Sequence, residues 1–266
     1  MRIVLNINPK VDNSPSINAA IAAAKEGDTI QFPSGLIPIH EPIVVDKRLN
    51  LIGDEDGTTE IATSLNSTAL IVSKGSIRPT KILNIFFRNA YGLNKTCDGV
   101  QISAIVDMEN CWVKSFGGNG ITVSADVGKL KTNASFSKFS NLLISENSGH
   151  GIYFQGGDAN QCSVIHCDAR DNKGIGFYDH SFLGNQFFGC MAHYNGAKVL
   201  PNYSADDPNN RATFIGCYSE QGSAPEILAG CATWHGGLAA NGFELRSWAK
   251  VFTKEPSALP TRKVLS

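Results

Sequence analysis

The feature that most constrains the fold of this chain is a degenerate repeat with a period of roughly 23 to 31 residues. Self-similarity built from short alternating segments at a near-constant period is typical of a β-solenoid. The repeat is seen by aligning NIFFRN from residue 84, NCWVKS from 110, NLLISE from 141, HCDARD from 166, GCMAHY from 189 and GCYSEQ from 216.

Two columns of this alignment are predicted to point into the core, because residues two apart share one face of a strand. These columns are Ile85, Cys111, Leu142, Cys167, Cys190 and Cys217, and then Phe87, Val113, Ile144, Ala169, Ala192 and Ser219. The positions between and after them are predicted to point outward. They are Phe86, Trp112, Leu143, Asp168, Met191 and Tyr218, and then Arg88, Lys114, Ser145, Arg170, His193 and Glu220.

A second strand in each coil is marked by a glycine followed by alternating residues. The glycine suits a corner that needs a positive φ, and the period of two then resumes. The third face is expected to be short and irregular. The pattern therefore predicts an all-β, single-domain parallel β-helix. The segments are Gly99-Val100-Gln101-Ile102, Gly120-Ile121-Thr122-Val123, Gly151-Ile152-Tyr153-Phe154 and Gly174-Ile175-Gly176-Phe177.

Length and composition limit the classes of function. A chain of 266 residues can form one extended β domain, and its net charge of −1 gives no bulk attraction to nucleic acid or an anionic membrane. Neither a signal peptide nor an apolar membrane span is recognised. Four of the seven cysteines occupy the inward column, so we expect free buried thiols. We predict an N-terminal segment with a helix over 1–25, the β-helix over 26–235 and a C-terminal cap or tail over 236–266.

A short helix is predicted from Ser16 to Lys25, with Ser16 as its cap and Ile17, Ala20 and Ile21 on one stripe. The end of a solenoid exposes backbone groups and apolar side chains, so it needs a lid. This helix is the candidate lid.

The stretch INAAIAAAKEGDTIQFPSGLIPI from residue 17 and PIVVDKRLNLIGD from residue 42 resemble the N-terminal part of the pectate-lyase-like superfamily of right-handed parallel β-helices. The resemblance extends in pattern from residue 16 to about 230. It implies polysaccharide-directed chemistry, since the superfamily includes lyases, polygalacturonase-like hydrolases, epimerases and phage tailspike depolymerases. A fold does not select among these reactions.

Outward columns bring chemistry-bearing residues of successive coils together, because stacked coils are about 4.8 Å apart. We predict a catalytic patch of Asp168, Arg170, His193 and Glu220. A hydrolase would use Asp168 and Glu220 as its pair of carboxylates. A uronate lyase would use Arg170, His193 and a tyrosine, Tyr194 or Tyr218, as cation, base and acid. The same patch fits both mechanisms, and ordinary pairing of charges across a solvated sheet is the alternative to both.

Aromatic side chains are predicted to bind the substrate, because their faces pack against sugars. The exposed apolar row that includes Trp112, Met191 and Tyr218 also suits contacts between subunits. We therefore expect a homotrimer. The predicted substrate-binding residues are Trp112, Tyr153, Tyr178, Tyr194 and Tyr218.

Two weaker motifs are considered. Gly149-His150-Gly151 is similar to a polygalacturonase motif, but the paired aspartates expected before it are missing. Phe177-Tyr178-Asp179-His180 loosely resembles a segment near calcium in pectate lyases, and Asp158, Asp168, Asp171 and Asp179 add oxygen ligands. No cofactor is predicted, with calcium as the alternative. The segment 199–211 is expected to wall a groove beside His193 and Glu220.

These observations predict a protein that cleaves a polysaccharide by lyase or hydrolase chemistry. The resemblance, the missing signal peptide and the free cysteines together indicate a phage tailspike-type protein, which reaches the exterior by lysis. The alternatives are a non-catalytic trimeric fibre or carbohydrate-binding protein, and a uronate C5-epimerase. Polysaccharide and a second and third copy of the chain are the expected partners; nucleic acid and membrane are not.

Overall fold

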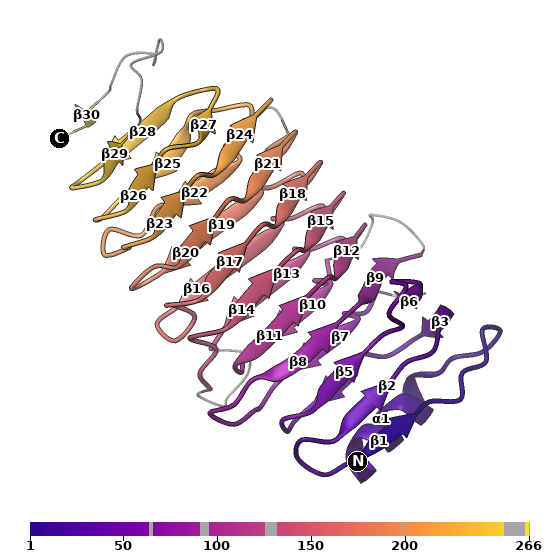
Figure 1. Cartoon of the computed structure of the whole chain (residues 1–266). Coiled ribbons are helices and arrows are strands. Elements are labelled where there is room, and N and C mark those ends of the chain that lie inside the picture. The colour runs from indigo at the N-terminus through magenta and orange to yellow at the C-terminus, as the bar shows by residue number, and fades with distance from the viewer. Residues whose placement is uncertain (64–65, 91–95, 126–131, 198, 253–263, 266) are drawn as a thin grey trace.

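The computed structural model describes residues 1–63, 66–90, 96–125, 132–197, 199–252 and 264–265. The chain winds through three parallel sheets, here called A, B and C, and its two ends lie at opposite ends of the solenoid (Figure 1). The predicted fold, a right-handed parallel β-helix with an N-terminal capping helix, is confirmed.

Sheet A is the face that sequence analysis expected to be short and irregular; its strands are short, three or four residues each, but the expectation of irregularity is wrong. It is a regular ladder in which inward aromatic side chains stack; Phe187 and Phe214 lie 4.7 Å apart between ring centroids. Its described strands are β1 (Arg2–Val4), β2 (Thr29–Gln31), β5 (Asn50–Ile52), β8 (Thr80–Leu83), β11 (Val106–Glu109), β14 (Lys138–Ser140), β17 (Ser163–Ile165), β20 (Gln186–Phe188), β23 (Thr213–Ile215), β26 (Thr233–His235) and β29 (Lys250–Phe252).

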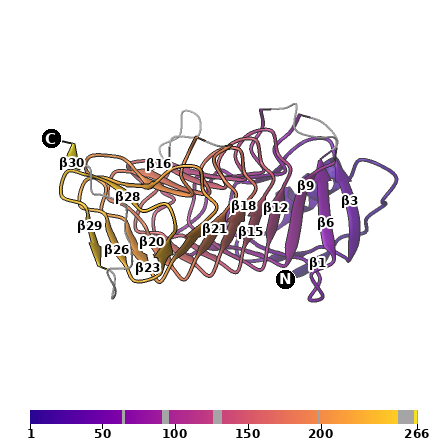
Figure 2. The ribbon, with the colours of Figure 1, turned by 90° about the horizontal axis from the view of Figure 1, so that it is seen from above.

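Sheet B contains the repeat from which the fold was predicted, and its strands lie side by side along the solenoid (Figure 2). Both inward columns are buried, and the outward columns pair residue to residue as expected. Its described strands are β3 (Gly35–Ile39), β6 (Thr59–Thr63), β9 (Ile85–Asn89), β12 (Trp112–Lys114), β15 (Leu143–Ser145), β18 (Asp168–Arg170), β21 (Met191–His193), β24 (Tyr218–Glu220) and β27 (Leu238–Ala239).

Sheet C follows sheet B in every coil. The predicted second strands belong to it, with one correction: Ile152 pairs with Phe177, so Gly176 rather than Gly174 takes the place of Gly151. Its described strands are β4 (Ile43–Val45), β7 (Leu70–Val72), β10 (Val100–Ile102), β13 (Ile121–Ser124), β16 (Ile152–Gly156), β19 (Phe177–Ser181), β22 (Tyr203–Ala205), β25 (Glu226–Leu228), β28 (Phe243–Arg246) and β30 (Val264–Leu265).

The glycines before the strands of sheet C are required by close backbone approach, not by a positive φ. A Cβ on Gly151 would lie 2.3 Å from the carbonyl oxygen of Gly176, and one on Gly120 would lie 2.8 Å from that of Gly151. Positive φ instead occurs at the turn from sheet A to sheet B, where Asn84 has a φ of 58°. Asparagine tolerates this left-handed conformation better than most residues, which explains the polar first letter of the repeat.

The capping helix α1 (Ser14–Ala23) begins two residues before the predicted start. Asn13 rather than Ser16 occupies the N-cap position, and Ile17 and Ile21 are buried against the first coil. The side-chain amide of Asn18 makes two hydrogen bonds to the backbone at the edge of β4: it donates to the Pro42 carbonyl and accepts from the Val44 N–H, each at 2.9 Å. The helix therefore covers a strand edge, which is the role predicted for it.

Buried polar ladders stabilise the turn from sheet B to sheet C. Asn147, Asn172 and Asn195 each donate to the next asparagine amide at 2.9 Å, and Asn202 ends the row by donating to Ser219 Oγ at 2.9 Å. The four cysteines of the inward column, Cys111, Cys167, Cys190 and Cys217, are buried free thiols, as expected. The division of the chain at residues 25 and 235 stays a prediction.

Candidate functional site

The predicted catalytic patch lies on the outward face of sheet B. The strand register places Arg170 beside His193 and His193 beside Glu220, as the repeat predicted. Asp168 Oδ1 lies 3.3 Å from His193 Nε2, without hydrogen-bond geometry, and Asp168 Oδ2 lies 3.8 Å from the Arg170 guanidinium. Burial raises the pKa of Asp168, and the charges of His193 and Arg170 oppose that shift.

The second carboxylate of this patch is already engaged. Tyr218 donates a hydrogen bond of 2.6 Å to Glu220, and this contact raises the pKa of the Tyr218 hydroxyl. A glycosidase needs two carboxylates that face one substrate, one as acid and one as base or nucleophile. Here each carboxylate has its own side-chain neighbours, which is the ordinary pairing of charges across strands.

Trp112 is less available to a sugar than its exposure suggests. The Phe86 ring stacks on it with centroids 4.4 Å apart, and Trp112 Nε1 donates to Ser145 Oγ at 3.1 Å. The Lys114 ammonium lies 5.1 Å from the Trp112 ring centroid. Beside these rings, at the corner between sheets A and B, is a hollow of about 380 Å³. Stacking within the protein therefore uses much of the ring surface that could bind a glycan.

The predicted tyrosines do not form one group. Tyr194 is 53% exposed and lies near His193, with ring centroids 5.4 Å apart, and Tyr218 is on sheet B. Tyr153 and Tyr178 lie on sheet C, a different face of the solenoid. The structure thus separates the predicted substrate-binding residues between two faces.

Sheet C carries a second cluster, centred on Asp206. This carboxylate accepts a hydrogen bond of 2.9 Å from the Tyr178 hydroxyl and lies 2.7 Å from His180 Nδ1. Tyr178 stacks on Tyr153 with centroids 4.9 Å apart. Burial and the bond to Asp206 raise the pKa of Tyr178, and burial raises that of Tyr153. Both phenols therefore stay protonated across the physiological range.

The contact between His180 and Asp206 fixes the tautomer of the imidazole. A carboxylate accepts and does not donate, so His180 holds a proton at Nδ1. In the neutral ring, Nε2 then carries the lone pair. This arrangement, a histidine oriented by a buried or half-buried carboxylate, is the one that general bases use. The His180 side chain is 43% exposed, so a substrate can reach it.

His150 completes the cluster from the neighbouring coil. Its ring centroid lies 4.8 Å from that of Tyr178 and 5.4 Å from that of Tyr153. Its Nδ1 accepts a hydrogen bond of 2.9 Å from the Ile175 N–H. Burial lowers the pKa of His150 to about 4, against the opposing charges of Asp206 and Asp98.

A polar network borders the cluster on its N-terminal side. Asp98 accepts from the Asn119 N–H at 2.8 Å and from the Thr122 hydroxyl at 2.7 Å. Asn119 Oδ1 in turn accepts from the His150 N–H at 2.8 Å. The outward face of sheet C is therefore polar and aromatic from β10 to β22.

Connections differ in length around the two faces. Where both strands of a coil are described from β8 onward, the turn from sheet A to sheet B takes one or two residues, for example Asn84 between β8 and β9. Sheet C is bordered by longer connections, such as 194–202 before β22 and 157–162 after β16. Longer loops on a rigid scaffold are where binding specificity usually resides, so sheet C is the better-bordered face.

Two sequence expectations about this region change. The segment 199–211 begins beside sheet B, where the Asn202 amide donates to the Glu220 carbonyl at 2.9 Å, but its Tyr203 is fully buried in β22 and its Asp206 lies on the outward face of sheet C. Asp179, expected among calcium ligands, is fully buried and accepts from the N–H groups of Ser181 and Asn185. Within the described ranges, no group of three or more His, Cys, Asp or Glu side chains is arranged to hold a metal ion.

The sequence analysis did not identify Asp206 as a site residue, because the repeat around it lacks the corner glycine that marks the other second strands. Asn202-Tyr203-Ser204-Ala205 occupies the register of Gly176-Phe177-Tyr178-Asp179, with asparagine in place of the corner glycine. The inward aromatic position was the available signal, since Phe177 and Tyr203 stack with centroids 5.1 Å apart. Aligning these segments puts Asp206 next to His180.

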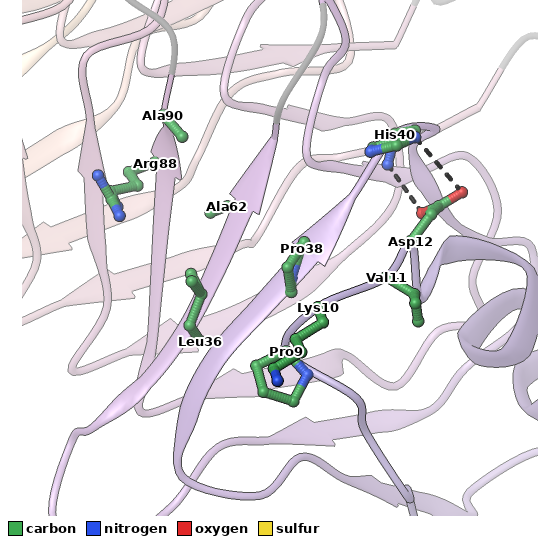
Figure 3. A pocket seen from close by; sticks show the side chains of 10 residues that line it. All are labelled: Pro9, Lys10, Val11, Asp12, Leu36, Pro38, His40, Ala62, Arg88 and Ala90. Atoms are coloured by element: carbon green, nitrogen blue, oxygen red, sulfur yellow. Dashed lines mark hydrogen bonds and ion pairs between the residues drawn. The ribbon is translucent and has the colours of Figure 1, made fainter.

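A second hollow, of about 330 Å³, lies on the outer side of β3, β6 and β9 near the N-terminus (Figure 3). Figure 3 shows its basic side chains, Lys10, His40 and Arg88, set apart from one another around Leu36 and Pro38. Arg88 is already paired with Glu60, and Asp12 accepts from the His40 N–H at 2.9 Å. Two of its basic residues thus already have partners, which makes this hollow a weaker candidate site than the cluster on sheet C.

No protein-family model and no curated protein matches the chain. Among solved structures, ORF18 of Geobacillus virus E2 is similar over 99% of this chain, with a TM-score of 0.69 and 15% identity. The chain spans 60% of that viral protein. This likeness shows the shared fold.

Two solved enzymes are similar at lower scores. A pectate lyase has a TM-score of 0.48 and 17% identity, over 99% of this chain and 74% of its own. A pectin methylesterase from Aspergillus niger also has a TM-score of 0.48, with 11% identity, over 100% of this chain and 90% of its own. In the described part of this chain, no helix is long and apolar enough to span a membrane.

Proposed function

We propose that the protein is a polysaccharide lyase that binds an acidic glycan across the outward face of sheet C. The observation that carries this proposal is the contact of Asp206 with both His180 Nδ1 and the Tyr178 hydroxyl. It supplies an oriented base beside protonated phenols, and these are the groups that an elimination needs.

The step follows from the protonation states. His180 Nε2 takes the proton from the carbon next to a uronate carboxylate, and that C–H electron pair forms the new carbon–carbon double bond. The glycosidic C–O bond at the neighbouring carbon breaks, and its electron pair goes to the leaving oxygen. The Tyr153 hydroxyl donates a proton to that oxygen; its raised pKa keeps it protonated until then. No redox partner is required.

Hydrolysis is less well supported on this face. A glycosidase needs two carboxyl groups about 5 to 9.5 Å apart. Asp98 precedes β10 and Asp206 follows β22, so these carboxylates are four coils apart, about 19 Å at the usual strand spacing. Asp98 is also committed to Asn119 and Thr122.

Asp168, Arg170, His193 and Glu220 remain the alternative catalytic set, on sheet B. We favour a second role for that face, in contacts between copies of the chain. Its outward row includes Leu36, Met191 and Leu238, which are 40%, 40% and 45% exposed. The turns that lead into it from sheet A are short, one or two residues from β9 onward. A trimer that packs through sheet B would leave sheet C open to the glycan.

A phage tailspike-type role is part of the proposal. It is supported by the fold shared with ORF18 of Geobacillus virus E2, a viral protein. Such a protein would meet its glycan on a cell surface, outside the cell in which it is made. The non-catalytic alternative is a trimeric fibre that only adheres to that glycan.

The proposal is tested by incubating the protein with purified uronate-containing and neutral bacterial polysaccharides and analysing the released oligosaccharides by mass spectrometry. A lyase yields products that are lighter by one water than hydrolysis products and that carry an unsaturated end. His180→Gln is expected to abolish them, whereas the matched change His193→Gln on sheet B is expected to leave them. Hydrated products, or no cleavage of a glycan that binds, contradict the lyase. Solvent deuterium incorporated without cleavage indicates an epimerase.

A further inference from the structure

His150 has a fixed proton position that its neighbours impose. The Ile175 N–H donates to Nδ1 at 2.9 Å, and an N–H can donate only to a lone pair. Nδ1 therefore carries no proton, and the neutral ring holds its proton at Nε2. Protonation of Nδ1 would set two N–H groups against each other.

The backbone of His150 is held as firmly as its ring. Its own N–H donates to Asn119 Oδ1 at 2.8 Å, and the Asn119 N–H donates to Asp98 at 2.8 Å. Tyr178 packs against one part of the imidazole at an interplanar angle of 62°. These contacts leave the ring little freedom to turn.

The Nε2–H group of His150 is the unused donor of the site. Across the residues that the structure describes, no backbone or side-chain oxygen accepts a hydrogen bond from it. Two of the neighbouring donors are already committed, since the Tyr178 hydroxyl and His180 Nδ1 both contact Asp206, and the Tyr153 hydroxyl serves the leaving oxygen in the proposed step. An N–H without an acceptor beside a base and a phenol is suited to a ligand oxygen.

We propose that His150 donates its Nε2–H to a carboxylate oxygen of the bound uronate and stabilises the negative charge that develops there during elimination. The inference rests on the proposed lyase activity and assigns to His150 the task that a cation would otherwise perform. The base is then His180 and the electrophilic donor is His150, although both are histidines on one face.

The electrostatic surroundings agree with this division. Four titratable groups surround His150: Asp98 and Asp206 as carboxylates, and Tyr153 and Tyr178 as phenols. The carboxylates favour a cationic ring, but burial outweighs them and lowers the pKa of His150 to about 4. A neutral histidine donor has one advantage over a cation. A nearby positive charge would disfavour the protonated, positively charged form of the base His180, whereas a neutral ring does not.

The kinetic test compares two substitutions at position 150. Removing a donor of this kind typically lowers kcat by about 10² to 10³-fold, so we expect that loss for His150→Ala with little change in KM. His150→Gln keeps an N–H near the position of Nε2, so its kcat is expected to be at least about tenfold higher than that of His150→Ala. The exposed corner residue His166 gives the control, because His166→Gln is expected to match the wild type. Equal activity of His150→Ala and the wild type overturns the inference.

A second test does not depend on activity. In protein labelled with ¹⁵N-histidine, the His150 ring should show a proton on Nε2 and a hydrogen-bonded, unprotonated Nδ1 at every pH from 5.5 to 9. Addition of a bound uronate oligosaccharide should shift the Nε2–H resonance. A ring that titrates near the ordinary value of about 6.5, or an Nε2–H that ignores a bound ligand, overturns the inference. If no glycan is cleaved but Nε2–H shifts on binding, the lyase fails and the donor role stands.

Discussion

The outward faces of sheets B and C are built from the same repeat, yet they are equipped for different chemistry. On sheet B, charges pair within or between neighbouring strands: Asp168 with Arg170 and His193, Lys114 with Glu146 at 2.9 Å, and Tyr218 with Glu220. On sheet C, one carboxylate orients a histidine, and another histidine keeps a free donor. A row of charged residues is therefore a weaker sign of a catalytic site than an acid–base group whose protonation state is fixed.

Replacing the orienting carboxylate should give the largest contrast between the two faces. Asp206→Asn removes the charge that holds His180 in its basic tautomer, so we expect kcat/KM to fall by about 10² to 10⁴-fold. Asp168→Asn is the matched change on sheet B and should alter kcat/KM by less than about threefold. Steady-state kinetics on the cleaved glycan measure both. The reverse ranking would move the active site to the residues first predicted from sequence.

The inner side of sheet C contains a carboxyl group that should make stability depend on pH. Glu226 is fully buried; its carboxyl accepts from the Tyr203 N–H at 2.6 Å and contacts Ser219 Oγ. Burial raises its pKa to about 8, from an ordinary value of 4.5. The stability that the neutral form provides is therefore complete below pH 4.5 and is lost as pH rises through about 8, by up to about 1.4 kcal/mol per pH unit.

The corresponding experiment follows Tm from pH 5 to pH 9. We expect the wild type to lose several degrees over that range and Glu226→Gln to lose much less. Glu220→Gln, on the outer side of sheet B, should follow the wild type. A wild-type Tm that is constant with pH would show that Glu226 titrates outside this range.

Two tyrosines allow a smaller and sharper comparison, since each donates to a carboxylate on its own face. Tyr178→Phe removes the bond to Asp206 and should lower kcat by roughly tenfold, because hydrogen bonds to charged groups contribute about 1.5 kcal/mol or more. Tyr218→Phe removes the bond to Glu220 and should leave kcat unchanged. Steady-state kinetics measure kcat of the two phenylalanine variants and so compare the two faces. Equal losses in both would mean that the glycan contacts both faces.

The smallest effect on activity is expected at the proposed contact between copies through sheet B. Met191→Asp together with Leu238→Asp should convert a trimer to a monomer in sedimentation velocity, because buried charges without partners are costly. The fold and the cleavage of short oligosaccharides should persist. A wild-type protein that already sediments as a monomer contradicts the trimer and leaves sheet B without a partner.

Much of sheet B could be predicted from sequence, because each of its strands from β9 onward follows a turn of one or two residues. The pairing of Arg170 with His193 and of His193 with Glu220 followed from two rules. Alternate residues of a strand share a face, and equivalent residues of successive coils lie side by side. The same reasoning failed for Asp206, because Asn202 replaces the corner glycine that marked the other strands. It also failed to predict the regularity of sheet A, because no glycine directly precedes its strands to mark them in the sequence.

The sequence by itself determined the solenoid, its inward columns and its capping helix, since these depend on local periodicity and on burial of apolar side chains. Only the tertiary structure decided which polar residues meet on sheet C. Tyr153 and Tyr178 were expected to serve the residues of sheet B, yet the turn before each strand directs them to another face. The proton positions on His150 and His180 were also decided there, because a tautomer is fixed by the groups that neighbouring coils place against the ring.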